Sequence, residues 1–302
     1  MNIDLVPDIK NQPQIYRAHK TGKLVLFVGA GASAIWGCHR WEDLAVKLID
    51  DCFEKEKINF WAKKSLIAKY SGSPRRLITI TKEMLGPDYL SCLKNRLNSI
   101  PDRKEKYSLL FKNLADLNAA IITTNIDDNL ACCFHKKDIH VGVDRFGSSI
   151  SSKKLYQLHG LMGHDDSLVM TIDEYINQYR HPNIQAFLKH VFTEEDYCLL
   201  FLGYGMGDLE IIDYMMEKYK EETRRLFNRY YILLPYFNQE KGLLRHEEAY
   251  FKQINMTIVP YQLDERGYDQ LHEVIATWKK ELTAENRNDE FYKFTDLIDK
   301  NL

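Results

Sequence analysis

The feature that most constrains this chain is an unbroken apolar run followed at once by glycines. Residues 24–28 read LVLFV without polar alternation, and the next five residues, 29–33, read GAGAS. Such a run predicts a strand buried on both faces, as in a parallel sheet covered by helices. A helical pattern begins near Trp41, and a strand, a glycine turn and a helix in this order let a backbone offer amide N–H groups to a phosphate. The sequence therefore predicts an α/β protein with a nucleotide loop after its first strand.

Further sheet-like runs follow along the chain, with helical segments between several of them. These runs are AAIITTN (119–125), KKLYQLHG (153–160), DYCLLFLGYG (196–205), RYYILLPY (229–236) and MTIVPYQL (256–263). Strands that alternate with helices predict a doubly wound, mostly parallel, Rossmann-like sheet.

The domain organisation is expected to be simple. Residues 1–20 form a polar lead-in, residues 21–282 one catalytic domain, and residues 283–302 a polar C-terminal helix or linker. Helical patterns fill residues 42–118, which we interpret as a helical insertion or small subdomain over the nucleotide edge of the sheet. Ordinary crossover helices fit this stretch equally well.

The composition of the chain bears on three kinds of partner, namely nucleic acid, metal ions and membranes. The chain has 302 residues, a formal charge of −2 and a pI near 6.6, which give no reason to expect a nucleic-acid partner. Its six cysteines include no CxxC pair, so the sequence predicts reduced thiols and no metal site. The N-terminus lacks the order of a signal peptide, and the longest weakly polar stretch, 24–37, is too short to span a bilayer. We expect a cytoplasmic protein without a membrane partner.

Four of the predicted strands end in polar or glycine-rich motifs. They are GAGAS (29–33), TTNIDDN (123–129), HG (159–160) and GYGMGD (203–208). Because ligands of open α/β sheets bind outside the carboxyl ends of the strands, these motifs stand where a site is expected.

The first motif has two interpretations. GAGASA (29–34) fits the G-x-G-x-x-[G/A] dinucleotide pattern. The acidic residue that should follow some 20 residues later corresponds to Asp50 or Asp51, which fall inside a predicted helix rather than at a strand end. The loop therefore lacks the dehydrogenase context, and a strand-to-helix turn that needs small residues is the structural alternative to a nucleotide loop.

The other motifs also have a structural alternative beside the functional one. Asn125 and Asp127 could bind ribose hydroxyls or position water, or they could be turn and cap residues for a helix near Asn129. His159 ends an apolar run before a glycine, where it could act as a general base or be a hydrogen-bonded core histidine. Asp208 could cap the following helix or bind a ribose.

In order and spacing, the four motifs together resemble those of the sirtuin (silent information regulator) superfamily over residues 24–210. The resemblance implies NAD as the substrate, with Asn125 and Asp127 at its nicotinamide end and His159 as the base near the ribose hydroxyls. The NAD-binding residues that it implies are Gly29, Ala30, Gly31, Ser33, Thr124, Gly203, Tyr204, Gly205 and Asp208.

Departures from the family pattern point to one branch of it. Protein-deacylating sirtuins carry a zinc ribbon of two CxxC pairs, which this chain lacks, and their GAGxS loop continues differently from WGCHRWEDL (36–44). In these respects the chain resembles bacterial sirtuin-like NAD hydrolases of antiphage systems. That resemblance implies hydrolysis of NAD+ to nicotinamide and ADP-ribose, so that NAD is depleted in antiphage defence by abortive infection. A protein deacylase or ADP-ribosyltransferase, and a non-catalytic NAD or ADP-ribose sensor, stay open as alternatives.

Regulation is expected as well, because a free NAD hydrolase would harm its own cell. The family resemblance implies a homo-oligomer held inactive until a phage-derived activator or a partner defence protein acts on it.

Overall fold

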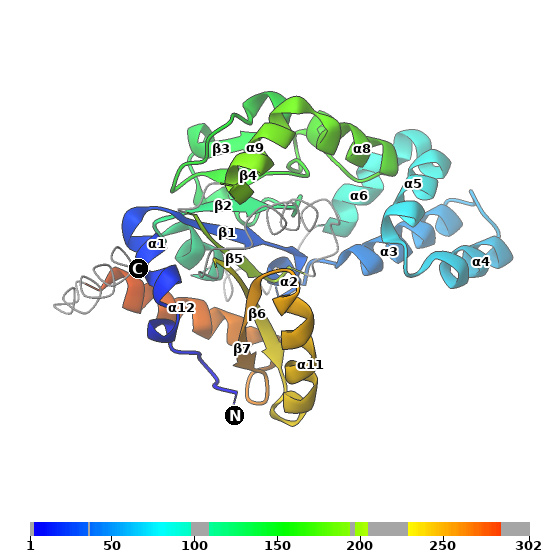
Figure 1. Cartoon of the computed structure of the whole chain (residues 1–302). Helices are drawn as coiled ribbons and strands as arrows, with labels where there is room; N and C mark the ends of the chain where they lie inside the picture. The colour runs from blue at the N-terminus through cyan, green and yellow to red at the C-terminus, as the bar shows by residue number, and fades with distance from the viewer. Residues whose placement is uncertain (1–2, 36, 98–108, 194–196, 205–228, 285–302) are drawn as a thin grey trace.

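A computed structural model describes residues 3–35, 37–97, 109–193, 197–204 and 229–284 (Figure 1). Within these ranges, seven strands form one sheet in the order β3-β4-β2-β1-β5-β6-β7, and every pairing is parallel. The strands are β1 Leu24–Val28, β2 Ala119–Thr123, β3 Ile139–Val141, β4 Leu155–Gln157, β5 Cys198–Leu202, β6 Tyr230–Tyr236 and β7 Met256–Gln262. The predicted doubly wound α/β fold is confirmed.

The order of the strands reverses beside β1. The early strands β2, β4 and β3 lie on one side of β1, and the late strands β5, β6 and β7 lie on the other. Val28, the last residue of β1, is in register with Thr123 of β2 and Leu202 of β5. The carboxyl ends of these three strands therefore meet at one edge, where open α/β sheets bind their ligands.

Helices cover both faces of the sheet because β1 sends alternate side chains to opposite sides. Leu24, Leu26 and Val28 belong to one apolar core, whereas Val25 and Phe27 belong to the other. Helices α1 and α12 pack in the first core, and α8, α9 and α11 contribute to the second (Figure 1). Among the described residues, the helices outside the insertion are α1 Pro13–Thr21, α2 Ala30–Ala34, α8 Ile172–Arg180, α9 Pro182–Thr193, α11 Lys241–Lys252 and α12 Gln270–Thr283.

A third apolar core lies in the segment that the sequence predicts to be a helical insertion. Helices α3 Trp41–Glu54, α4 Phe60–Tyr70, α5 Pro74–Leu85 and α6 Tyr89–Leu97 pack on one another beside the sheet (Figure 1). Asp50 and Asp51 lie within α3, as expected. The boundaries given for the domain and its insertion stay predictions.

Two structural details differ from the expectation. The segment after Asn129 forms only a short 3-10 turn, Ala131–Cys133, in place of the expected helix. Strand β3 has no counterpart among the predicted strands, because its three half-buried residues form no apolar run.

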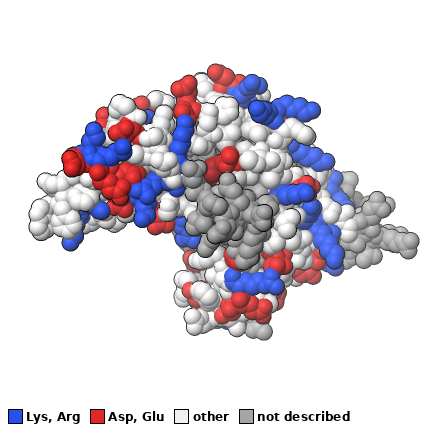
Figure 2. All heavy atoms as spheres, turned by 180° about the vertical axis from the view of Figure 1, so that it is seen from behind, with Lys and Arg blue, Asp and Glu red and all other residues white. Residues whose placement is uncertain are grey.

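The surface agrees with the nearly neutral total charge. Acidic and basic side chains are interspersed over the described part of the face that Figure 2 shows. No helix in the described ranges combines the length and the apolarity that crossing a membrane requires.

Candidate functional site

Two glycine loops cross at the ends of β1 and β5. The amide of Gly29 donates to the carbonyl of Leu202 at 3.0 Å, and the amide of Gly31 donates to the carbonyl of Gly203 at 2.8 Å. A Cβ on Gly31 would lie 2.9 Å from the Cα of Gly203, and one on Gly29 would lie 2.5 Å from the Gly203 oxygen. The glycines are thus required by close backbone packing, which gives weight to the small-residue turn interpretation of this loop.

Asn125 is the best-anchored polar residue at this edge. Thr123 donates its hydroxyl to the carbonyl of Val28 at 2.7 Å and accepts the amide N–H of Asn125 at 3.0 Å. The side-chain Nδ2 of Asn125 donates to the carbonyl of Gly29 at 3.1 Å and to the hydroxyl of Ser33 at 2.9 Å. A backbone carbonyl can only accept, so this contact fixes which end of the amide is nitrogen.

The oxygen of the same amide, Oδ1, lacks a hydrogen-bond partner among the described residues. Asn125 is 8% exposed, and its buried Oδ1 accepts no hydrogen bond from the part of the chain that the structure describes. An unsatisfied buried acceptor costs about 1–3 kcal/mol, so it needs an explanation such as a ligand or water that completes it.

Asp127 continues this polar network. Its carboxylate accepts the backbone N–H of Asn129 at 3.1 Å and is hydrogen-bonded to the Ser33 hydroxyl, which in turn contacts Asn125. Burial raises the pKa of the Asp127 carboxyl above its ordinary 3.8, and these hydrogen bonds lower it only in part. Asp127 therefore has both the turn-forming contact expected of it and a link to Asn125.

A pocket opens where these residues gather. It holds about 360 Å³ of empty space, part of it open to solvent. Residues from α2, the segment before α3, the start of α3, the end of α6 and the exit of β2 line it: Ala30, Ser33, Cys38, His39, Trp41, Leu44, Leu97, Thr124, Asn125, Ile126 and Asp127. Five of the predicted site residues thus share one cavity, namely Ala30, Ser33, Thr124, Asn125 and Asp127.

His159 lies just beyond the pocket wall. It follows β4, is 1% exposed, and its Nε2 lies 3.1 Å from the hydroxyl of Tyr179. The imidazole also makes edge contacts with the rings of Trp41, at 6.1 Å between centroids, and Tyr175, at 5.7 Å. Because Trp41 also lines the pocket, it connects the buried histidine to the cavity.

Four of the predicted NAD-binding residues, Gly203, Tyr204, Gly205 and Asp208, belong to the last motif, GYGMGD (203–208). The Tyr204 side chain is buried against Phe27 and Phe201, with its ring in the core of the sheet. Gly205 and Asp208 lie outside the described residues. Within the described ranges, no group of three metal-ligating side chains is found.

Sequence reasoning missed several residues of the site. Cys38, His39 and Trp41 line the pocket, although the segment joining the glycine loop to α3 carries no motif. Tyr179 contacts His159 from 20 residues away, and nothing in the spacing of the two residues indicates this contact.

A parallel, doubly wound sheet with polar loops gathered at its carboxyl edge defines a Rossmann-like α/β domain. The family model of the SIR2-like domain matches residues 119–259, from β2 into β7. The chain is also 25% identical over 209 residues to defense-associated sirtuin 2 of Bacillus subtilis, a match that covers 66% of this chain and 19% of that protein. The chain therefore contains a sirtuin-like domain, and it spans about a fifth of the length of the relative that it matches.

Proposed function

We propose that this domain hydrolyses NAD+ to nicotinamide and ADP-ribose. SIR2-like domains use NAD as their substrate, and the match to this family covers the strand exits that carry Asn125 and His159. The observation that carries the proposal is the orphaned Oδ1 of Asn125, a buried acceptor in a residue that lines the pocket.

Substrate binding would satisfy this acceptor. With Nδ2 tied to Gly29 and Ser33, the amide of Asn125 cannot turn, so Oδ1 is held in place to accept from a ribose hydroxyl or from the attacking water. A preorganised acceptor of this kind needs no rearrangement when the reaction takes place.

The chemical step is a displacement at the anomeric carbon of the nicotinamide ribose. The bond from this carbon to the nicotinamide nitrogen breaks, and its electron pair neutralises the cationic ring, which leaves as nicotinamide. Water forms the new carbon–oxygen bond and gives up one proton, and the transition state resembles an oxocarbenium ion. In this proposal the proton passes to His159 through a ribose hydroxyl, because the histidine itself does not line the pocket.

Asp127 supplies the negative charge that an oxocarbenium-like transition state requires. Its raised pKa means that it gains a proton at a higher pH than an ordinary aspartate does. The rate is therefore expected to fall on acidification while the pH is still above the usual range for aspartate.

The biological setting follows from the relative. The match to a protein named defense-associated sirtuin 2 supports a role for this domain as an NAD-depleting effector in antiphage defence. We propose a homo-oligomer that a phage-derived activator or a partner defence protein switches on, since uncontrolled NAD loss would harm the host.

The test compares three purified proteins for nicotinamide release from NAD without added peptide. Asn125→Ala removes the orphaned acceptor and should lower the rate about 100-fold or more, the loss typical of a preorganised catalytic hydrogen-bonding group. Asn59→Ala is the matched control, because Asn59 caps α4 through the Ala62 amide and does not line the pocket.

NAD binding by calorimetry accompanies the assay. Turnover by wild type and by Asn59→Ala, but not by Asn125→Ala, supports the hydrolase. Binding without turnover by the activated protein would favour the sensor, and turnover only with an acylated peptide would favour the deacylase. Equal rates in all three proteins would remove Asn125 from the mechanism.

A further inference from the structure

Helix α8 contacts both His159 and the backbone beside it. The hydroxyl of Tyr179 lies 3.1 Å from His159 Nε2, and both residues are buried. The neighbouring Gln178 donates from its Nε2 to the carbonyl of Leu158 at 2.6 Å. Two consecutive residues of α8 therefore contact the exit of β4: Gln178 binds its backbone, and Tyr179 contacts the imidazole of His159.

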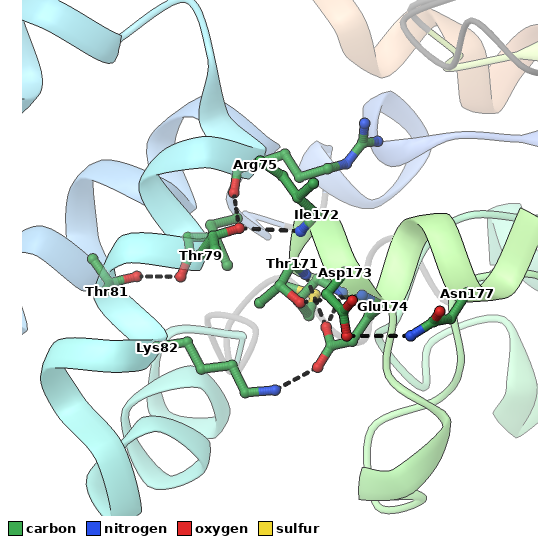
Figure 3. Close-up of polar contacts among 11 residues, drawn as sticks. Arg75, Thr79, Thr81, Lys82, Thr171, Ile172, Asp173, Glu174 and Asn177 are labelled. Atoms are coloured by element: carbon green, nitrogen blue, oxygen red, sulfur yellow. Dashed lines mark hydrogen bonds and ion pairs between the residues drawn. The ribbon is translucent and has the colours of Figure 1, made fainter.

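The first turn of α8 is itself fixed against the helical insertion (Figure 3). Glu174 and Thr171 form a reciprocal capping box, and the Glu174 carboxylate also pairs with Lys82 of α5. The amide of Ile172 donates to the hydroxyl of Thr79, again on α5, at 3.1 Å. These contacts fix the position of the first turn of α8 relative to α5.

The second turn adds a stacked pair. The Arg75 guanidinium of α5 lies over the ring of Tyr175 with 3.5 Å to the centroid, and Tyr175 meets His159 edge-on. The rings of Tyr175 and Tyr179 are themselves in contact, with centroids 4.5 Å apart. Tyr179, whose hydroxyl contacts His159, therefore belongs to a helix that is packed against α5.

We propose that Tyr179 is a positioning residue whose oxygen accepts a hydrogen bond from Nε2–H of His159. A tyrosine hydroxyl can donate or accept, and the direction of its bond to one ring nitrogen decides which nitrogen of a neutral histidine keeps the proton. Placing the proton on Nε2 leaves the lone pair on Nδ1, so Nδ1 is the nitrogen that can take a proton. The catalytic meaning of this arrangement rests on the proposed NAD hydrolysis, whereas the tautomer itself does not.

The experiment reads the tautomer directly. Nitrogen-15 correlation spectra distinguish the protonated from the unprotonated ring nitrogen, and the His159 signals are assigned by their loss in His159→Gln. The test variant, Tyr179→Phe, removes the hydroxyl and keeps the ring. The matched control is Tyr156→Phe, which removes a buried hydroxyl on β4 that accepts the Ser151 amide at 3.0 Å.

In the wild type and in Tyr156→Phe, His159 should carry its proton on Nε2 alone. In Tyr179→Phe the two tautomers should mix, and kcat should fall about tenfold, the equivalent of one hydrogen bond, with little change in KM. A proton on Nδ1 in the wild type, or an unchanged tautomer in Tyr179→Phe, would overturn the proposal. The wild-type spectrum decides even if the variant fails to fold.

Failure of the proposed function has a different signature. If the activated wild-type protein releases no nicotinamide, the hydrolase assignment is lost, while the spectra still report whether Tyr179 sets the tautomer.

Discussion

Substituting Gly203 tests whether the two glycine loops are held together by backbone contact. Gly203 has φ +58°, and a Cβ there would lie 2.4 Å from the backbone nitrogen of Ala32. A left-handed conformation costs a non-glycine residue about 1–2 kcal/mol. Displacing a packed backbone adds about 1–3 kcal/mol. We therefore expect Gly203→Ala to lower the free energy of unfolding by about 2–5 kcal/mol.

Two other glycines separate these contributions. Gly267 has φ +57°, close to that of Gly203, but open space around its Cβ position, so Gly267→Ala should cost only the conformational part, about 1–2 kcal/mol. Gly31 has no left-handed φ, yet its Cβ would lie 2.9 Å from Gly203, so Gly31→Ala should cost only the packing part, about 1–3 kcal/mol.

Urea unfolding of the three variants, followed by circular dichroism, measures all of these changes. The expected result is that Gly203→Ala loses more stability than either single-effect variant. A Gly203→Ala protein as stable as Gly267→Ala would show that the loops move apart at little cost, and the packing argument would be wrong.

Three further predictions concern contacts away from the pocket. Arg96 on α6 makes two hydrogen bonds to Asp51 on α3, at 2.6 and 3.2 Å, so Arg96→Met should cost about 1–2 kcal/mol in chemical denaturation. Burial tends to raise the pKa of Glu174, but its bonds to Lys82 and to backbone N–H groups lower it below the ordinary 4.5. The stability that Glu174 contributes is therefore present above pH 4.5 and lost as the pH falls through the lowered value, and the stability gap to Glu174→Gln should close there. Burial lowers the pKa of His19 to about 4, and both its ring nitrogens lack hydrogen-bond partners among the described residues. Between pH 6.5 and about 4 the unfolded chain binds a proton that the folded chain does not. The free energy of unfolding of the wild type should therefore decrease as the pH is lowered through this range, and the decrease should be smaller in His19→Phe.

Local pattern was enough to predict the centre of the fold. The LVLFV run predicted β1 because a strand buried on both faces leaves no polar position, and all five of its residues are buried. The same reasoning placed Asn125 and Asp127 at a strand exit, where they line the pocket. Sequence could not show why Gly31 must be glycine, because the reason is its contact with Gly203 across the sheet.

Features that depend on tertiary packing could not be predicted from the sequence. Strand β3 exists because it pairs with β4, and its own residues are too polar to predict a strand. Tyr179 reaches His159 from α8, a helix that also contacts the insertion, and these segments share no sequence signal. Whether Asn125 acts in catalysis or only in a turn likewise depended on its neighbours, since the orphaned Oδ1 is visible only in three dimensions.

The most direct test of the account is a product analysis of NAD incubated with the wild-type chain, alone and with the activator once it is known, beside Asn125→Ala. The account predicts equimolar nicotinamide and ADP-ribose from the wild type without any peptide, and at least about 100-fold less from the variant. NAD bound at the pocket but left intact by the activated protein would contradict it.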